Sequence, residues 1–291
     1  MAQGFDKIGL TARLTAYMRQ FSDIPFAADV ARRLGAEQTF ERLLADAQLR
    51  PRDLLWYAPI FEVRYKSIGE AIRKSGATQV LELASGLSLR GLAMTRDPAV
   101  TYVESDLEEL TEVKRSLVAE LRREYGLPSH GNLHLVTANA LDRDRLQLAV
   151  EPFRRDRPIA VVHEGLLQYL SRDEMEAVAR NIRELLAGFG GVWITPDFSL
   201  KADVENVSEQ QRRFRAVIAR ATERVMYDNA FAGDEQLFAL LESLGLEARV
   251  LNQVDETPAV TSLDALDLPR RILDDVKPRL RLWVSTVRGR H

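Results

Sequence analysis

The chain contains no cysteine among its 291 residues. This absence excludes disulfide bonds, thiolate metal sites and a cysteine nucleophile together. The chain also lacks an apolar run near the roughly 18 to 20 residues that cross a bilayer, and its first twenty residues contain no apolar core of signal-peptide length. We therefore expect a cytoplasmic protein without a membrane-spanning segment.

A strong charge of either sign is missing as well. The formal net charge is -3 and the sequence pI is near 5.9, with acidic and basic residues interleaved. This balance indicates neither nucleic acid nor an anionic membrane surface as a partner. Apolar residues make up 46% and charged residues 29%, which is typical of a packed globular protein. The oligomeric state leaves no signal in the sequence.

The first part of the chain has a helical pattern. We interpret residues 1–58 as an N-terminal helical cap, and residues 59–291 as the main domain. A further helix near 59–74 places apolar residues and one arginine four positions apart. These are Ile60, Arg64, Ile68 and Ile72. Arg64 therefore lies on an otherwise apolar stripe, unless it is a surface or capping arginine.

From residue 79 onward, apolar strand-like segments alternate with helical ones. We expect strands at 79–84, 99–105, 132–138, 159–164, 191–197, 246–251 and 281–287. The alternation predicts a largely parallel sheet with helices on both faces. The sequence SRDE at 171–174 predicts a capping box at the start of one of these helices. Residues 200 to about 230 form a charged helical insertion after the fifth strand.

Polar residues follow several strands, where ligands bind in open α/β sheets. They are Glu82 with the turn Ala84-Ser85-Gly86, Glu104 with Asp106, Asn139, and Glu164 with Tyr169. Small residues in the turn allow a cofactor to approach the backbone. Asp106, about 20 residues after Gly86, suits a ribose diol, with Glu104 as second choice. Leu89 takes the third small position of a dinucleotide fingerprint, so a cofactor without phosphates fits better.

The quoted motifs resemble those of a known family. LELASGLSLR resembles the first motif of S-adenosylmethionine-dependent methyltransferases. Together with YVESDL, ANALD and HEGLLQYL, it is similar to the leucine carboxyl methyltransferase family, including its bacterial polyketide O-methyltransferase-like members. The similarity covers roughly 55–190, with weaker support from TARLTAYMR near the start. It implies a doubly wound, mostly parallel seven-stranded class I methyltransferase (Rossmann-like) sheet whose last strand is antiparallel.

The resemblance also implies a site. Arg64 would bind the methionine carboxylate of S-adenosylmethionine and Glu164 its ammonium group. Ala84 and Gly86 would form the turn, after Glu82, around the amino-acid end. Asp106 would bind the ribose, and Asn139 with Ala140 would lie near the adenine. Ala84 stands where the family usually has glycine, which requires a negative φ for the alanine. Asp106 has the alternative role of a helix N-cap, and the two roles are compatible.

The acceptor side is less defined. Tyr169 and Asp197 are candidate acceptor contacts, although Tyr169 also fits a buried tyrosine bonded to the backbone. We expect His163 to point into the sheet packing, and neither His130 nor His134 has a metal-ligand spacing, so we expect no metal. The insertion at 200–230 has two interpretations. It is either a lid over the acceptor or a solvated amphipathic helix pair.

Three functions stay open. The favoured one is an O-methyltransferase that acts on a carboxylate or hydroxyl oxygen of a small molecule or a protein carboxyl terminus. The second is a nicotinamide-dependent oxidoreductase, although the chain lacks a catalytic Tyr-x-x-x-Lys pair. The third is a noncatalytic protein that retains the cofactor pocket.

Overall fold

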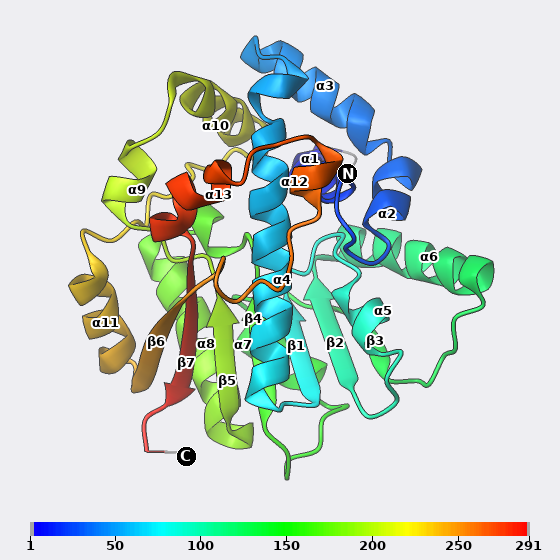
Figure 1. The fold of residues 1–291 in the computed structure, drawn as a ribbon. Coiled ribbons are helices and arrows are strands. Elements are labelled where there is room, and N and C mark those ends of the chain that lie inside the picture. Colours follow the sequence, from blue (N-terminus) through cyan, green and yellow to red (C-terminus); the bar gives the residue numbers. More distant parts are fainter. Residues whose placement is uncertain (1–2, 290–291) are drawn as a thin grey trace.

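A single seven-stranded sheet organises the protein (Figure 1). The computed structural model describes the backbone of residues 3–289 and the side chains from residue 9 to 289. The strand order is β3-β2-β1-β4-β5-β7-β6, and only β7 runs antiparallel to its neighbours. The strands are β1 (Gln79–Leu83), β2 (Thr101–Asp106), β3 (Leu133–Thr137), β4 (Ile159–His163), β5 (Gly191–Thr195), β6 (Leu246–Asn252) and β7 (Arg281–Val287). All seven predicted strands and the predicted doubly wound topology are confirmed.

Alternating strand residues build one core on each face of the sheet, as the twofold period of a strand requires. Val80 packs with residues of α4 (Ala58–Ser75), such as Ile68. Leu81, its neighbour, packs on the opposite face with residues of α8 (Arg172–Phe189), such as Ile182. Both faces are therefore covered, and polar groups meet solvent or ligand mainly at the ends of the strands.

The helix that begins after Ser171 has the predicted capping box. The Ser171 hydroxyl accepts from the amide of Glu174, and the Glu174 carboxylate accepts from the amide of Ser171. The other helices that flank the sheet are α5 (Arg90–Met94), α6 (Glu108–Tyr125), α7 (Arg143–Ala149) and α11 (Asp234–Ser243). Three short segments complete the main domain's connections: η3 (Leu167–Tyr169), α12 (Ser262–Ala265), and α13 (Arg271–Val276) with η4 (Lys277–Arg279).

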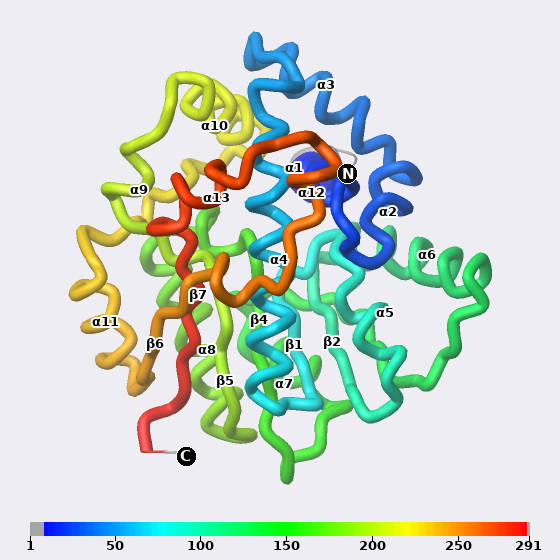
Figure 2. Tube along the Cα trace, in the orientation of Figure 1, coloured from blue at the N-terminus to red at the C-terminus, as the bar shows by residue number. Residues whose placement is uncertain are grey.

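The N-terminal layer lies over the carboxyl ends of the parallel strands, beside the insertion (Figure 2). The layer comprises α1 (Gln3–Arg19), α2 (Ala27–Arg33), α3 (Ala36–Ala47), η1 (Pro51–Asp53) and η2 (Leu55–Tyr57). The insertion contains α9 (Lys201–Glu205) and α10 (Glu209–Thr222). Met18, Phe40 and Ile218, from α1, α3 and α10, share one apolar cluster. Segments about 200 residues apart in the chain thus form one roof over the sheet edge.

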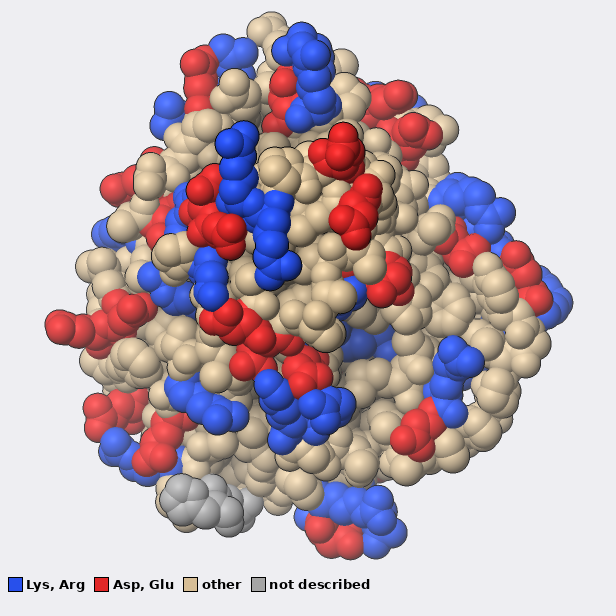
Figure 3. Space-filling model, in the orientation of Figure 1, with Lys and Arg blue, Asp and Glu red and all other residues tan. Residues whose placement is uncertain are grey.

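Charges of both signs are mixed over the face drawn in Figure 3. This mixture matches the balanced composition, and the face presents no continuous patch of one sign. Within residues 3–289, no helix is both long enough and apolar enough to span a bilayer.

Candidate functional site

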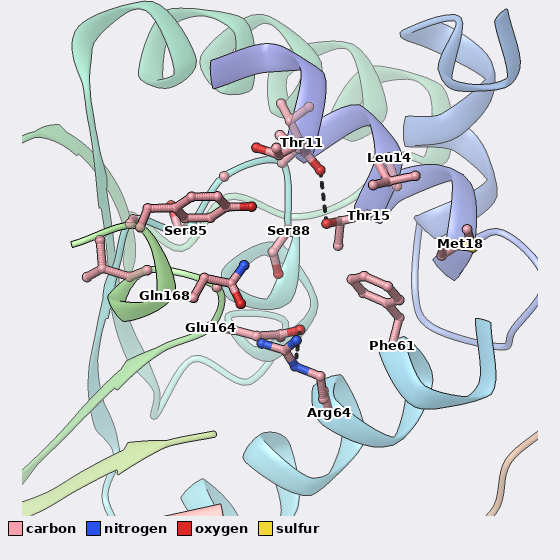
Figure 4. A pocket seen from close by; sticks show the side chains of 18 of the residues that line it. Thr11, Leu14, Thr15, Met18, Phe61, Arg64, Ser85, Ser88, Glu164 and Gln168 are labelled. Carbon is pink, nitrogen blue, oxygen red and sulfur yellow. Dashed lines mark hydrogen bonds and ion pairs between the residues drawn. The ribbon is translucent and has the colours of Figure 1, made fainter. Parts of the chain in front are cut away.

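A cavity of about 520 Å³ lies between the strand ends and the helices α1, α4 and α10. Its size is within the range of small-molecule sites. Eight of the predicted site residues line it: Arg64, Glu82, Ala84, Gly86, Asp106, Asn139, Glu164 and Tyr169. Figure 4 shows side chains of α1, including Thr15, facing Ser88, Glu164 and Gln168 across this space. Ala140 and Asp197, the other two predicted residues, are not among the lining residues.

The turn after β1 is strained at an alanine. Ala84 has a φ of 47° and Gly86 a φ of 54°, so both lie in the left-handed region. The condition under which an alanine fits this position without strain, a negative φ, is therefore not met. A left-handed conformation costs a residue with a Cβ about 1 to 2 kcal/mol, whereas glycine adopts it freely. The contacts of the surrounding residues hold the alanine in this geometry.

Asp106 fastens the turn to the end of β2. Its Oδ2 accepts from the amide of Gly86 at 2.6 Å, and its Oδ1 accepts from the amide of Leu107 at 2.8 Å. Burial raises the pKa of this carboxyl, although Lys114 and the two amides oppose the rise. Leu107, not Asp106, is the N-cap of α6, so the helix-cap interpretation of Asp106 is wrong. Asp106 belongs to the cavity wall.

A cluster of arginines and acids forms the floor beside the turn. Nη2 of Arg19 lies 2.6 Å from both carboxylate oxygens of Glu164. Nε of Arg64 and Nη2 of Arg90 each approach the same carboxylate at 3.6 Å. Glu164 therefore lies among three guanidinium groups. Arg90 does not line the cavity; its guanidinium stacks 3.9 Å over the Tyr65 ring.

Two of these arginines have a buried N–H group that donates no hydrogen bond to a described residue. Arg19 and Arg64 line the cavity, and the Nε of each is buried without a hydrogen-bond partner in the part of the chain that the structure describes. An unpaired buried donor costs about 1 to 3 kcal/mol. A carboxylate of a ligand would satisfy both groups, because guanidinium donors match carboxylate oxygens. The donor set thus fits the amino-acid end of the expected cofactor.

Arg19 lines the cavity but was not predicted from the sequence. It stands in TARLTAYMRQ at the end of α1, and its side chain is only 8% exposed. A cation in that amphipathic stretch carries the same signal as Arg64 on its apolar stripe. The spacing of α1 relative to β4 is a tertiary property, however, and it decides that Arg19 meets Glu164.

Asp197 has a different placement from the one expected. Its carboxylate is fully enclosed and accepts from the amides of Gly165, Leu166 and Leu167. It also pairs with Arg64 at 3.2 Å and with His163 Nδ1 at 2.9 Å. Asp197 therefore shapes the loop after β4, and it lines a smaller cavity next to the main one, so its contact with an acceptor stays a prediction. His163 is buried within the sheet packing, as predicted, with Trp193 donating to its Nε2.

The remaining predicted residues divide between surface and core. Asn139 is exposed at the cavity rim, and its Oδ1 accepts from the amide of Leu141 at 3.0 Å. Ala140 is buried in the core, and its carbonyl oxygen accepts from Nδ2 of Asn181 at 3.0 Å. Tyr169 lines the cavity, and burial raises its pKa to about 12. No group of three or more His, Asp or Glu side chains suited to a metal occurs among the described side chains.

Comparisons with known proteins agree with this architecture. The sequence pattern of the family described as leucine carboxyl methyltransferase matches residues 20–183. A protein of Mycolicibacterium gilvum, provisionally named an S-adenosyl-L-methionine-dependent methyltransferase, is 30% identical over 205 residues, which cover 62% of this chain and 64% of that relative. A similarly named protein of Mycobacterium marinum is 27% identical over 195 residues, covering 62% and 63%. The matched region thus spans less than two thirds of these relatives.

Solved structures support the fold. The crystal structure of a DUF574 family protein from Streptomyces avermitilis aligns with a TM-score of 0.59 at 15% identity, and the alignment covers 95% of this chain and 96% of that one. At this identity the likeness shows the fold alone. The family pattern, in contrast, covers more than half of the chain, from the end of α1 into α8. The chain belongs to the leucine carboxyl methyltransferase family.

Proposed function

We propose that this protein transfers the methyl group of S-adenosylmethionine to an oxygen atom of a small acceptor. The observation that carries the proposal is the pair of cavity arginines, Arg19 and Arg64, whose Nε atoms lack a hydrogen-bond partner among the described residues. Family membership and the names of the relatives support the same cofactor. When bound, the cofactor supplies an electrophilic methyl group on a sulfonium.

Each residue of the site would bind a different part of the cofactor. Arg64 and Arg19 would bind the carboxylate, and Glu164 would accept from the ammonium group. Asp106 would accept from the ribose hydroxyls with the lone pairs that its two amide contacts leave free. Asn139 would lie near the adenine at the rim. The chain's contribution to rate would then be to hold donor and acceptor at near-attack distance in a water-poor cavity.

For the acceptor, we propose a carboxylate on an apolar body. The acidic residues that line the cavity are already engaged: Glu164 with arginines, Glu82 with the hydroxyl of Tyr102, and Asp106 with amides. A pKa of about 12 keeps Tyr169 protonated at neutral pH. No histidine lines the cavity among the described residues. A carboxylate needs no general base, whereas a phenol or alcohol does.

The upper part of the cavity favours an apolar acceptor body. Side chains from α1, α4 and α10 contribute apolar surface there, including Leu14, Phe61 and Ile218. Arg215 also lines the cavity, with its guanidinium 4.7 Å from the ring centroid of Tyr227. A cation at the edge of an apolar lobe suits a small organic acid. The helices that enclose this lobe favour such a molecule over a protein terminus.

Calorimetric titration separates the candidate functions. We expect binding of S-adenosylmethionine and of its demethylated product, and none of nicotinamide dinucleotide. Transfer of a labelled methyl group into a panel of apolar carboxylic acids, with the matching alcohols as controls, then tests turnover and acceptor class. Binding of the dinucleotide alone would reject the proposal. Donor binding without transfer to any extract component would favour the noncatalytic alternative.

A further inference from the structure

Lys114 is a buried lysine to which the proposed function assigns no role. It lies on α6 with its side chain 2% exposed, and its Nζ forms an ion pair with Oε2 of Glu104 at 2.8 Å. The same Nζ donates to Oγ of Ser85 at 2.7 Å. Burying an ammonium group is costly unless several partners compensate. The contacts of the buried ammonium group should therefore show what offsets the cost of its burial.

Ser85 is the centre of the strained turn. It stands between Ala84 and Gly86, both with positive φ, and its amide donates to the carbonyl of Ser105 at 3.1 Å. Ser85 lines the cavity, whereas Lys114 does not. The ammonium group of Lys114 thus contacts the turn on the side that faces away from the cavity. Backbone strain of this kind persists only where neighbouring groups restrain it.

Glu104, the ion-pair partner of Lys114, also contacts the start of α5. Oε1 of Glu104 accepts from the amide of Gly91, at the start of α5, at 2.8 Å. A Cβ at Gly91 would lie 2.5 Å from this oxygen, so the approach requires glycine. The Lys114 charge also opposes the rise in the pKa of Asp106 that burial causes. One ion pair therefore connects the turn with the start of α5, and it lies close to the carboxylate expected at the ribose.

We propose that Lys114 is a positioning residue for the methyl donor: through Ser85 it holds the turn at 84–86 in the shape that receives the donor, without touching the donor itself. This inference rests on the proposed function. The turn meets the amino-acid end and the ribose, which the donor and its demethylated product share. Lys114 therefore contributes to the affinity for both molecules by the same factor.

The test measures donor and product affinity by calorimetry. The variant combines Lys114→Met with Glu104→Gln, so that no unpaired charge is buried. We expect both dissociation constants to rise at least about 10-fold, which is the lower end of the value of one hydrogen bond to a charged group. The control is Lys66→Met, which removes the ion pairs of a lysine to Asp23 and Glu62 away from the cavity lining. Its affinities should stay at the wild-type level.

A double-mutant cycle separates positioning from general destabilisation. Ser85→Ala keeps the Lys114–Glu104 ion pair and remains measurable if the lysine variant fails to fold; it should itself weaken both affinities. In the Ser85→Ala background, replacing Lys114 and Glu104 should have little further effect. Independent, multiplying effects would overturn the inference, and so would unchanged affinities in Ser85→Ala. If the wild-type protein binds neither donor nor product, the proposed function itself fails.

Discussion

Nη2 of Arg19 lies 2.6 Å from both carboxylate oxygens of Glu164, and this contact ties the last turn of α1 to the residue after β4. Both side chains are less than one tenth exposed. The N-terminal layer is therefore held over the sheet edge by an ion pair that lies inside the predicted cofactor site. Under the proposed function, closure of the cavity and binding of the donor would involve the same two side chains.

Replacing Arg19 by methionine should weaken both stability and donor binding. Glu164 would lose its closest partner in a nearly dry site, and breaking a buried pair costs about 3 to 5 kcal/mol. The remaining ion pairs of Glu164 with Arg64 and Arg90 place the expected loss near the lower limit. Urea unfolding and calorimetry measure the two effects. Arg13→Met, on the same helix and outside the cavity lining, is the matched control.

Replacing Ala84 by glycine should stabilise the protein by about 0.5 to 1 kcal/mol. The variant relieves the left-handed strain at φ 47°, and this gain exceeds the added entropy of an unfolded glycine. Denaturant unfolding measures the change. Ala93→Gly, in α5, should instead destabilise by up to about 1 kcal/mol. Equal losses in the two variants would show that Ala84 is not strained.

Affinity for the donor should fall under mildly acidic conditions because of Asp106. Burial raises the pKa of this carboxyl above 3.8. The ionised form accepts hydrogen bonds, so the affinity is present above the raised pKa and is lost as the pH falls through it. Dissociation constants measured between about pH 4 and 8 should show this step. Asp106→Asn should bind the donor more weakly at neutral pH, and its dissociation constant should depend less on pH. If the variant showed the same step as the wild type, a group other than Asp106 would cause the pH dependence.

Asp197 should contribute to stability at neutral pH. Burial alone would raise its pKa, but the hydrogen bond to His163, the charge of Arg64 and the Gly165 amide lower it from 3.8 to about 2. A shift of this size corresponds to about 2 kcal/mol, present above pH 3.8 and lost as the pH falls toward 2. Urea unfolding across this range should reveal the loss. Asp197→Asn should be less stable at neutral pH and lack this step.

Much of the fold was predictable because local patterns agree with it. The strand segments combine apolar runs with flanking turns, and Ser171 with Glu174 is a complete capping signal. The insertion was predicted as helical, and α9 with α10 confirms this. The N-terminal segment was predicted as helical throughout, but Gly35, just before α3, and Gln48, just after it, have positive φ and interrupt the helical run. Local periodicity identifies helices better than it locates their breaks.

The site was predictable only in part. Residues that follow strands, such as Glu82 and Asp106, reach the same cavity because parallel strands end at one edge. Position in sequence did not reveal that Asp197 turns inward toward the loop amides. Arg19 and Lys114 were missed because their partners are set by tertiary packing. Arg19 of α1 meets Glu164 after β4, and Lys114 of α6 meets Ser85 in the turn, only once the helices dock on the sheet. Their partners are 145 and 29 residues away in the chain.

The sequence by itself determined the order of strands and helices, the small-residue turn and the polar groups at the strand ends, because periodicity and spacing are local properties. Tertiary structure decided which charges meet, as in the three arginines around Glu164 and the contact of Lys114 with Ser85. It also decided that Ala84 adopts a left-handed conformation. These features depend on long-range packing, since burial strengthens ion pairs and holds a strained backbone that no local pattern would specify.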